Sequence, residues 1–219
     1  MATKLAKKRN IPKDVVYDFA VWLIPSAVIG ARLGHILGNL GYYTKHPSEI
    51  IAIWHGGVAL YGGILGAIIA AIIFCKKKNI RFYNLADIFV IPLAFGTIFG
   101  RIGNFINQEL YGKITNLPWG VQFDNVVGKR HPTQIYEAFG NFIIFFVLIW
   151  LWKKNVKLGI VFWSYLTIYS FIRFFAEFLR DGNPFWIGLT MMQLIIIPVF
   201  FISIFYIYNI NKVYINKNI

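Results

Sequence analysis

Apolar residues form six long runs along the chain, and short polar segments separate them. The runs cover residues 15–38, 56–75, 84–106, 132–152, 158–179 and 190–210. A helix needs about 20 mostly apolar residues to cross a hydrocarbon layer about 30 Å thick. The pattern therefore predicts an all-α fold, a polytopic bundle of six transmembrane helices in which residues 1–219 form a single integral-membrane domain.

Small residues recur at intervals of four in the second run. They form two series, Gly62–Gly66–Ala70 and Gly63–Ala67–Ala71. Small residues at this spacing let two helix backbones approach closely in a membrane, so we interpret them as a packing surface. The alternative is that the glycines leave room for the acyl chains or glycerol of a substrate.

Polar residues interrupt the apolar runs in a helical register. In the fifth run Tyr165, Tyr169, Arg173, Glu177 and Arg180 are spaced by 4, 4, 4 and 3, which places them on one helix face. Charged residues at membrane depth are functional candidates, and Arg173 and Glu177 are i,i+4 partners. An ion pair that locks the bundle is one interpretation, and we favour the other, a polar stripe that lines a cavity opening outward.

The third and fourth runs carry matching stripes at i, i+3 and i+7. The residues are Arg101, Asn104 and Gln108 in one, and Gln134, Glu137 and Asn141 in the other, with Glu109 just beyond the first. We expect the three stripes to meet near the outer leaflet as one network. Because arginine's planar fork suits phosphate, and acyl chains carry phosphate into a membrane, the pattern favours a phospholipid ligand.

The composition agrees with a membrane protein: 58% of residues are hydrophobic and 14% are charged, and the mean hydropathy is +0.59. Soluble domains have about 25% charged residues. The net charge of +13 would suit nucleic acid. However, most of the basic residues lie in alternate loops, which fixes both termini of this chain in the cytoplasm and leaves no reason to expect a nucleic-acid partner. These residues are Lys4, Lys7, Lys8, Arg9, Lys13, Lys76, Lys77, Lys78, Arg81, Lys153, Lys154, Lys157, Lys212 and Lys217.

The single cysteine, Cys75, excludes an internal disulfide and a cysteine-rich metal site. We interpret it as a small packing residue at a helix end in preference to a nucleophile.

The segment ARLGHILGN at 31–39 is similar to GRIGNFINQ at 100–108, with Arg32 matching Arg101. This internal similarity is too short to establish a duplication.

Four segments carry a resemblance to a known family. They are GRIGNFINQELYG at 100–112, GGVALYGGILG at 56–66, HPTQIYEA at 131–138 and RFFAEFLRDG at 173–182. The chain resembles the bacterial phosphatidylglycerol–prolipoprotein diacylglyceryl transferases over essentially its whole length and in the family's order. The first segment is long and specific, and the others would be weak alone.

The resemblance implies a reaction in the bacterial plasma (inner) membrane. The thiol of a lipobox cysteine in a prolipoprotein takes the diacylglyceryl group of phosphatidylglycerol, a thioether forms, and glycerol phosphate leaves. This is the first step of lipoprotein maturation, and it uses no metal or organic cofactor. The attacking sulfur belongs to the substrate, so the enzyme needs no nucleophile of its own.

The resemblance also implies roles for individual residues. Arg101 and Asn104 would grip the lipid phosphate and stabilise the charge on the leaving group. Arg173 matches a second essential arginine, and Glu177 would hold it. Tyr169 and Glu109 match functional positions.

One departure from the family concerns the catalytic base. Some members carry a histidine before the second glycine pair of GGxxxxGG, where this chain has Tyr61. A phenol, with a reference pKa of about 10, is a poorer base. Tyr61 either positions the lipid or acts as an activated phenolate, and Glu109 and His131 are substitute bases, so the base stays unassigned.

A second departure concerns the N-terminus. The family typically has seven spans with an outer N-terminus, so the first span is expected to be missing here, either because Met1 lies downstream of the true start or because the chain is shortened. The rival functions are a lipid transporter or scramblase and a catalytically inactive relative. We also expect loop 108–131 to act as a gate for the peptide.

Overall fold

The structure, a computed structural model, describes residues 1–215, so Lys217 of the charge pattern lies outside it. The described residues contain helices and isolated β-bridges, without strands. The helices are α1 (Ala2–Lys7), α2 (Lys13–Gly38), α3 (Leu40–Tyr43), α4 (Leu60–Lys77), α5 (Phe82–Ile106), α6 (Thr133–Lys153), α7 (Ile160–Leu179) and α8 (Met191–Ile215), with short 3-10 helices η1 (Pro47–Ile50) and η2 (Ile53–His55). The all-α prediction is confirmed.

Five of the described helices are long and apolar enough to cross a membrane: α2, α4, α5, α6 and α8. Helix α7 fills the fifth predicted run but is not among them. Its polar stripe lowers its hydropathy, so composition supports one span fewer than the six predicted.

The chain divides into two compact units, Met1–Leu85 and Ala86–Ile219. The prediction that residues 1–219 form a single domain concerns how the two units act together. It stays a prediction.

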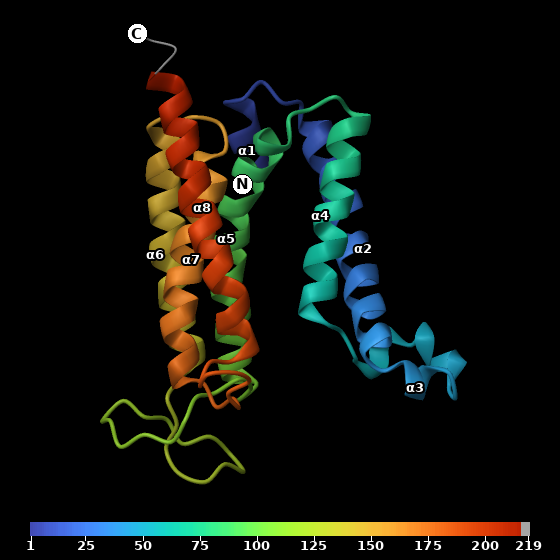
Figure 1. The fold of residues 1–219 in the computed structure, drawn as a ribbon, viewed down its shortest axis with the longest axis vertical. Helices are drawn as coiled ribbons and strands as arrows, with labels where there is room; N and C mark the ends of the chain where they lie inside the picture. The colour runs from blue at the N-terminus through green and yellow to red at the C-terminus, as the bar shows by residue number, and fades with distance from the viewer. Residues whose placement is uncertain (216–219) are drawn as a thin grey trace. The chain divides into compact units, whose positions relative to one another are not determined.

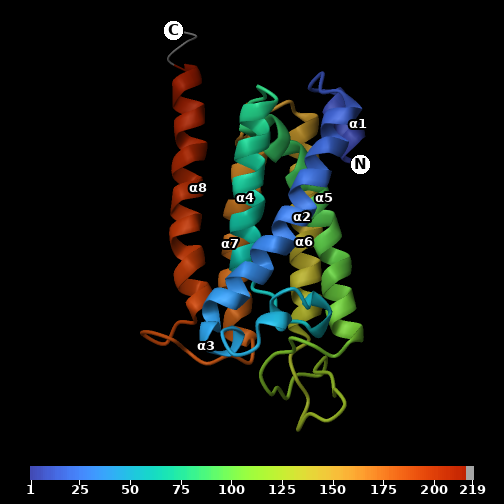
Figure 2. The ribbon, with the colours of Figure 1, turned by 90° about the vertical axis from the view of Figure 1, so that its right-hand side faces the viewer.

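The first unit is built on a hairpin of α2 and α4, which lie side by side and cross (Figures 1 and 2). Small residues bring the two backbones together: a Cβ added at Gly62 would collide with the backbone of Gly30 and of Gly34. A Cβ at Gly66 would meet the backbone of Ser26 and Gly30. The predicted packing surface of the second run is therefore confirmed.

Substitution of Gly62 by valine is expected to destabilise the hairpin, because the side chain has no space between α2 and α4. Overpacking of this kind costs about 1–3 kcal/mol, which we expect as a lower midpoint of thermal unfolding in detergent. The control is Gly38→Ala, since a Cβ at Gly38 has no neighbour within 4 Å. An unchanged midpoint for Gly62→Val would contradict the close packing.

Arg32 organises the connection between α2 and α4. Its buried guanidinium donates to the backbone carbonyls of the connection, and it also lies 5.3 Å from the centre of the Tyr43 ring. The carbonyls are those of Glu49, Ile50, Ala52, Gly56 and Gly57. The arginine therefore satisfies a set of backbone acceptors that would otherwise lack donors in this irregular segment.

Arg32→Gln is expected to loosen this connection, because unsatisfied buried carbonyls cost about 1–3 kcal/mol each. Hydrogen exchange should speed up about tenfold or more at the hydrogen-bonded amides of Glu49, Ala52 and Gly56. Lys45→Gln, which removes an exposed charge from the same connection, serves as the control. Equal exchange rates in the two variants would contradict the role of Arg32.

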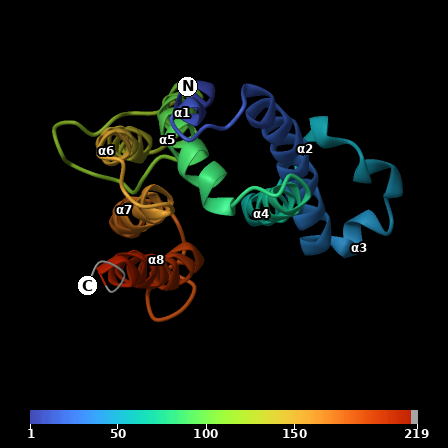
Figure 3. The same ribbon diagram turned by 90° about the horizontal axis from the view of Figure 1, so that it is seen from above.

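The second unit consists of α5 from Ala86 onward together with α6, α7 and α8. Helix α7 packs between α6 and α8, and the loop from α5 to α6 extends beyond the helix ends (Figures 1 and 3). Asp87 joins α5 to the start of α7: its buried carboxylate accepts from the backbone N–H groups of Gly159 (2.8 Å) and Phe162 (2.9 Å). This cap fixes the register of α7, and therefore of its polar stripe, against α5.

Candidate active site

A single carboxylate, that of Glu137 on α6, gathers three guanidinium groups. Its Oε1 lies 2.8 Å from Nη1 of Arg173 and 3.2 Å from Nη1 of Arg180, and its Oε2 lies 2.8 Å from Nη2 of Arg101. Only 4% of the Glu137 side chain is exposed. The contact joins α5, α6 and α7 at one point, so the expected meeting of the three stripes is confirmed within this unit.

Glu177 holds Arg173 from the other side. Its Oε2 lies 2.6 Å from Nη2 of Arg173, and its Oε1 accepts a hydrogen bond from Thr190 Oγ1 at 3.1 Å. The predicted i,i+4 pair is thus confirmed. Arg173, buried between two carboxylates, has a fixed orientation before any ligand arrives.

The cluster carries more positive than negative charge. Its directly paired members are three arginines and two glutamates. Burial lowers the pKa of the Arg180 guanidinium and Arg173 lowers it further, while Glu137 and Glu177 raise it. A buried site with surplus positive charge favours an anionic ligand, and guanidinium groups favour one with planar pairs of oxygens.

Arg101 links the ion-pair cluster to the exposed segment that follows α5. Its Nη1 lies 3.4 Å from Asn104 Oδ1, and Asn104 Nδ2 donates to Glu109 Oε2 at 3.1 Å. The Arg101 side chain is 18% exposed, against 6% for Arg173, and Glu109 is exposed. The Arg101 side chain is therefore more accessible than that of Arg173 and close to that of Arg180, which is 15% exposed. Asn104 relays the contact of Arg101 to Glu109.

The prediction for Gln108 is wrong. It was expected on the face of Arg101 and Asn104, but α5 ends at Ile106 and Gln108 has a φ of +58°. Its amide instead donates to Asp124 Oδ2 at 2.7 Å and accepts from the Asp124 backbone N–H at 2.6 Å. The same reversal brings the backbone N–H of Glu109 to the carbonyl of Asn104, which positions Glu109 beside the cluster.

The first turn of α6 fixes the segment that follows α5. Thr133 Oγ1 donates to the Leu110 carbonyl at 2.9 Å, and the Gln134 amide donates to the Glu109 carbonyl. Helix α6 begins at Thr133 with Pro132 at the N-cap, close to the start of the predicted run at residue 132. The base of loop 108–131 is therefore anchored, and the gating role of the loop stays a prediction.

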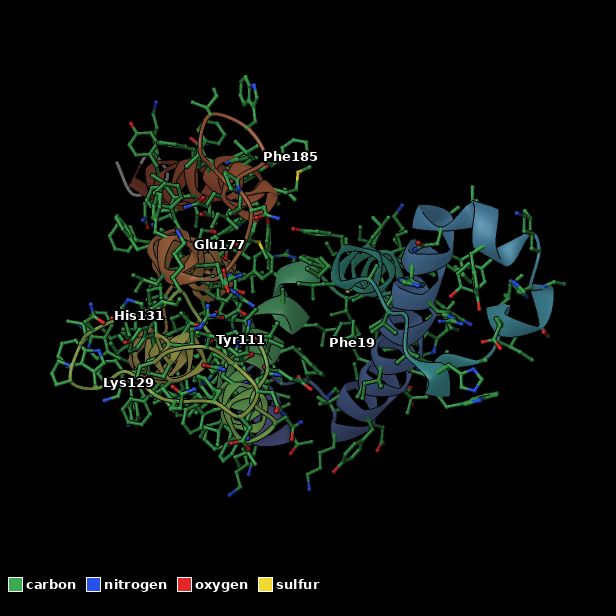
Figure 4. All side chains as sticks on the ribbon, turned by 90° about the horizontal axis from the view of Figure 1, so that it is seen from below. Phe19, Tyr111, Lys129, His131, Glu177 and Phe185 are labelled. Atoms are coloured by element: carbon green, nitrogen blue, oxygen red, sulfur yellow. The ribbon has the colours of Figure 1, made fainter. Side chains whose placement is uncertain are left out.

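The remaining predicted residues lie outside the ion-pair cluster. Tyr169 stacks on Tyr165, with ring centres 5.7 Å apart, one helical turn before Arg173. The ring nitrogen Nδ1 of His131 lies 3.3 Å from the hydroxyl of Tyr136. Figure 4 labels His131 before α6 and Glu177 near the end of α7. Tyr61 lies near the start of α4, in the first unit. The catalytic base stays unassigned.

The i, i+3, i+7 stripe placed Glu137 on the correct face and in the expected network. It was not assigned to the site, and its position between three arginines was not predicted. Its signal was the excess of arginines in the neighbouring stripes, which required a buried carboxylate between them. Among the described residues, no group of three or more His, Cys, Asp and Glu could hold a metal ion.

The helices and the arginine–glutamate cluster define a multi-pass helical membrane protein with a buried cationic site. The family described as prolipoprotein diacylglyceryl transferase matches residues 1–209. The chain is 42% identical over 200 residues to a phosphatidylglycerol–prolipoprotein diacylglyceryl transferase of Finegoldia magna, covering 91% of this chain and 80% of that protein. It is 42% identical over 196 residues to that of Clostridioides difficile (89% and 78% covered) and 38% identical over 208 residues to that of Geobacter sulfurreducens (91% and 78% covered). The chain belongs to the prolipoprotein diacylglyceryl transferase family.

Proposed function

We propose that this chain transfers the diacylglyceryl group of phosphatidylglycerol to the cysteine thiol of a prolipoprotein lipobox. The sulfur forms a bond to the glycerol carbon that carries the phosphate ester, and the C–O bond to the phosphate breaks. Glycerol phosphate leaves with the electron pair, and a base takes the thiol proton. The observation that carries the proposal is the convergence of Arg101, Arg173 and Arg180 on Glu137 in a chain of this family.

The cluster suits the charge change of this reaction. The lipid phosphate is a diester with one negative charge, and it leaves as a monoester that gains a second. Arg101, with Asn104 beside it, would bind the phosphate, and Arg173 would meet the charge that develops on it. Because Glu137 and Glu177 already orient Arg173, little reorganisation is needed during the reaction.

Three further residues have proposed roles around the phosphate. Tyr169, one turn from Arg173, would contact the lipid. Glu109 would orient Asn104 or take the thiol proton, and its exposure suits a group that meets an incoming peptide. Tyr61 would position the lipid or act as the base. The proposed substrates are phosphatidylglycerol and lipobox peptides, and we expect no cofactor.

The proposed location is the bacterial plasma membrane, with the site near the outer leaflet and both termini of this chain in the cytoplasm. The distribution of basic residues supports this orientation. Lys13 and Lys77 lie at the same end of the α2–α4 hairpin, where Lys78 Nζ also contacts Asp18 Oδ2 at 2.8 Å. This end would face the cytoplasm.

The direct test combines the purified chain, phosphatidylglycerol and a lipobox peptide. Mass spectrometry should find the peptide heavier by one diacylglyceryl group, with glycerol phosphate released in equal amount. A peptide with serine in place of cysteine is the matched control and should stay unmodified. Lipid movement between leaflets without release of glycerol phosphate would favour the scramblase, and neither activity would indicate an inactive relative.

A further inference from the structure

A basic cavity lies in the first unit, apart from the residues assigned to the reaction. It has a volume of about 390 Å³ and is lined by the segment that joins α1 to α2 and the segment that joins α4 to α5. Its polar lining consists of two arginines and three asparagines, and no carboxylate belongs to the lining among the described residues. The lining residues are Arg9, Asn10, Ile11, Pro12, Asn79, Ile80, Arg81 and Asn84.

Two similar turns hold the arginines. Asn10 (φ +54°) follows α1 and Asn79 (φ +52°) follows α4, both in the left-handed conformation that ends helices. The N–H of Ile11 bonds to the Ala6 carbonyl at 3.1 Å, and the N–H of Ile80 bonds to the Cys75 carbonyl at 2.9 Å. The backbone around the cavity is therefore held by two closed helix ends.

The cavity lies at the end of the α2–α4 hairpin, where a membrane surface would be. Lys77, in the last turn of α4, places its ammonium 5.2 Å from the centre of the Trp22 ring, and tryptophans favour the headgroup level. The two helix-joining segments and their flanks carry a large excess of positive charge, against the carboxylates of Asp14 and Asp18, the latter paired with Lys78. The basic residues are Lys4, Lys7, Lys8, Arg9, Lys13, Lys76, Lys77, Lys78 and Arg81.

From this cavity we infer a second phosphate site, which binds the phosphodiester headgroup of an anionic lipid at the membrane surface beside this end of the α2–α4 hairpin. Arg9 and Arg81 supply paired N–H donors for the phosphate oxygens, and the asparagine amides supply further donors for the rest of the headgroup. The apolar side chains of Ile11, Pro12 and Ile80 lie beside them, where the first carbons of the acyl chains would be. The site would anchor the hairpin end at the membrane surface and does not depend on the proposed reaction.

A diffuse attraction of lysines for anionic lipid is the competing explanation, and matched variants separate the two. Arg9→Gln/Arg81→Gln removes two charges from the lining, whereas Lys8→Gln/Lys76→Gln removes two charges from the same segments outside it. The probe is phosphatidylserine, titrated into the full-length protein in neutral detergent and counted as bound molecules by native mass spectrometry. Inorganic phosphate is titrated in a parallel series.

We expect the lining variant to bind one phosphatidylserine about tenfold or more weakly than the wild type, and the control variant to bind it within about twofold. Equal losses in both variants would reduce the effect to diffuse charge and overturn the site. Displacement of the lipid by millimolar inorganic phosphate would assign the cavity to a soluble phosphate and overturn the lipid assignment. The single variant Arg81→Gln, at an exposed position, repeats the test with the smallest change to the fold.

Discussion

Replacement of Arg101 by alanine is expected to lower the rate of diacylglyceryl transfer about 100- to 1,000-fold while the protein remains folded. Arg101 has a partly exposed side chain that reaches from Glu137 toward Asn104, so its loss would remove the main donor proposed for the lipid phosphate. The measurement is kcat/KM with phosphatidylglycerol and a lipobox peptide, with the thermal midpoint as a check of folding.

Two further variants define the origin of this effect. Arg101→Lys keeps the charge but loses the planar fork, so it should recover only part of the activity. Lys113→Ala removes an exposed charge from the loop after α5 and should leave the rate within about twofold, since exposed charges contribute little. Full activity of Arg101→Ala would show that the phosphate is bound elsewhere.

Replacement of Glu137 by glutamine is expected to have the largest effect on stability. The change leaves three buried or half-buried guanidinium groups without their shared carboxylate, and removing one partner of a buried ion pair costs about 3–5 kcal/mol. The thermal midpoint should fall clearly, and transfer should be lost because Arg101 and Arg173 no longer share an anchor.

The matched control is Glu49→Gln, which removes the Oε2 contact to His55 Nδ1 at 2.9 Å near the surface of the first unit. Exposed pairs contribute about 0–1 kcal/mol, so the midpoint should hardly move. If Glu137→Gln proved as harmless as Glu49→Gln, the arginine–glutamate cluster would not be the structural centre of the second unit.

Local periodicity explains which features were predictable. The spacing of Arg173 and Glu177 and the face shared by Gln134, Glu137 and Asn141 follow from 3.6 residues per turn, and the structure confirms both. The apolar runs likewise predicted the positions of the long helices, since length and hydropathy are local properties.

Contacts between distant segments explain what was missed. The convergence of α5, α6 and α7 on Glu137 and the cap of α7 by Asp87 join residues far apart in sequence. The short similarity around Arg32 and Arg101 does not extend to their contacts, because one guanidinium meets carbonyls and the other a carboxylate. Gln108 left its expected face because α5 ends two residues before it.

The most direct measurement is the contact between lipid phosphorus and arginine nitrogen in the full-length protein. Solid-state NMR with ¹⁵N-arginine and phosphatidylglycerol detects ¹⁵N–³¹P pairs at hydrogen-bonding separation. In an Arg9→Gln/Arg81→Gln background, which removes the second proposed phosphate site, we expect a contact that disappears when Arg101→Lys/Arg173→Lys is added. In that background, a contact that survives the loss of Arg101 and Arg173 would contradict the claim that these two arginines bind the lipid phosphate.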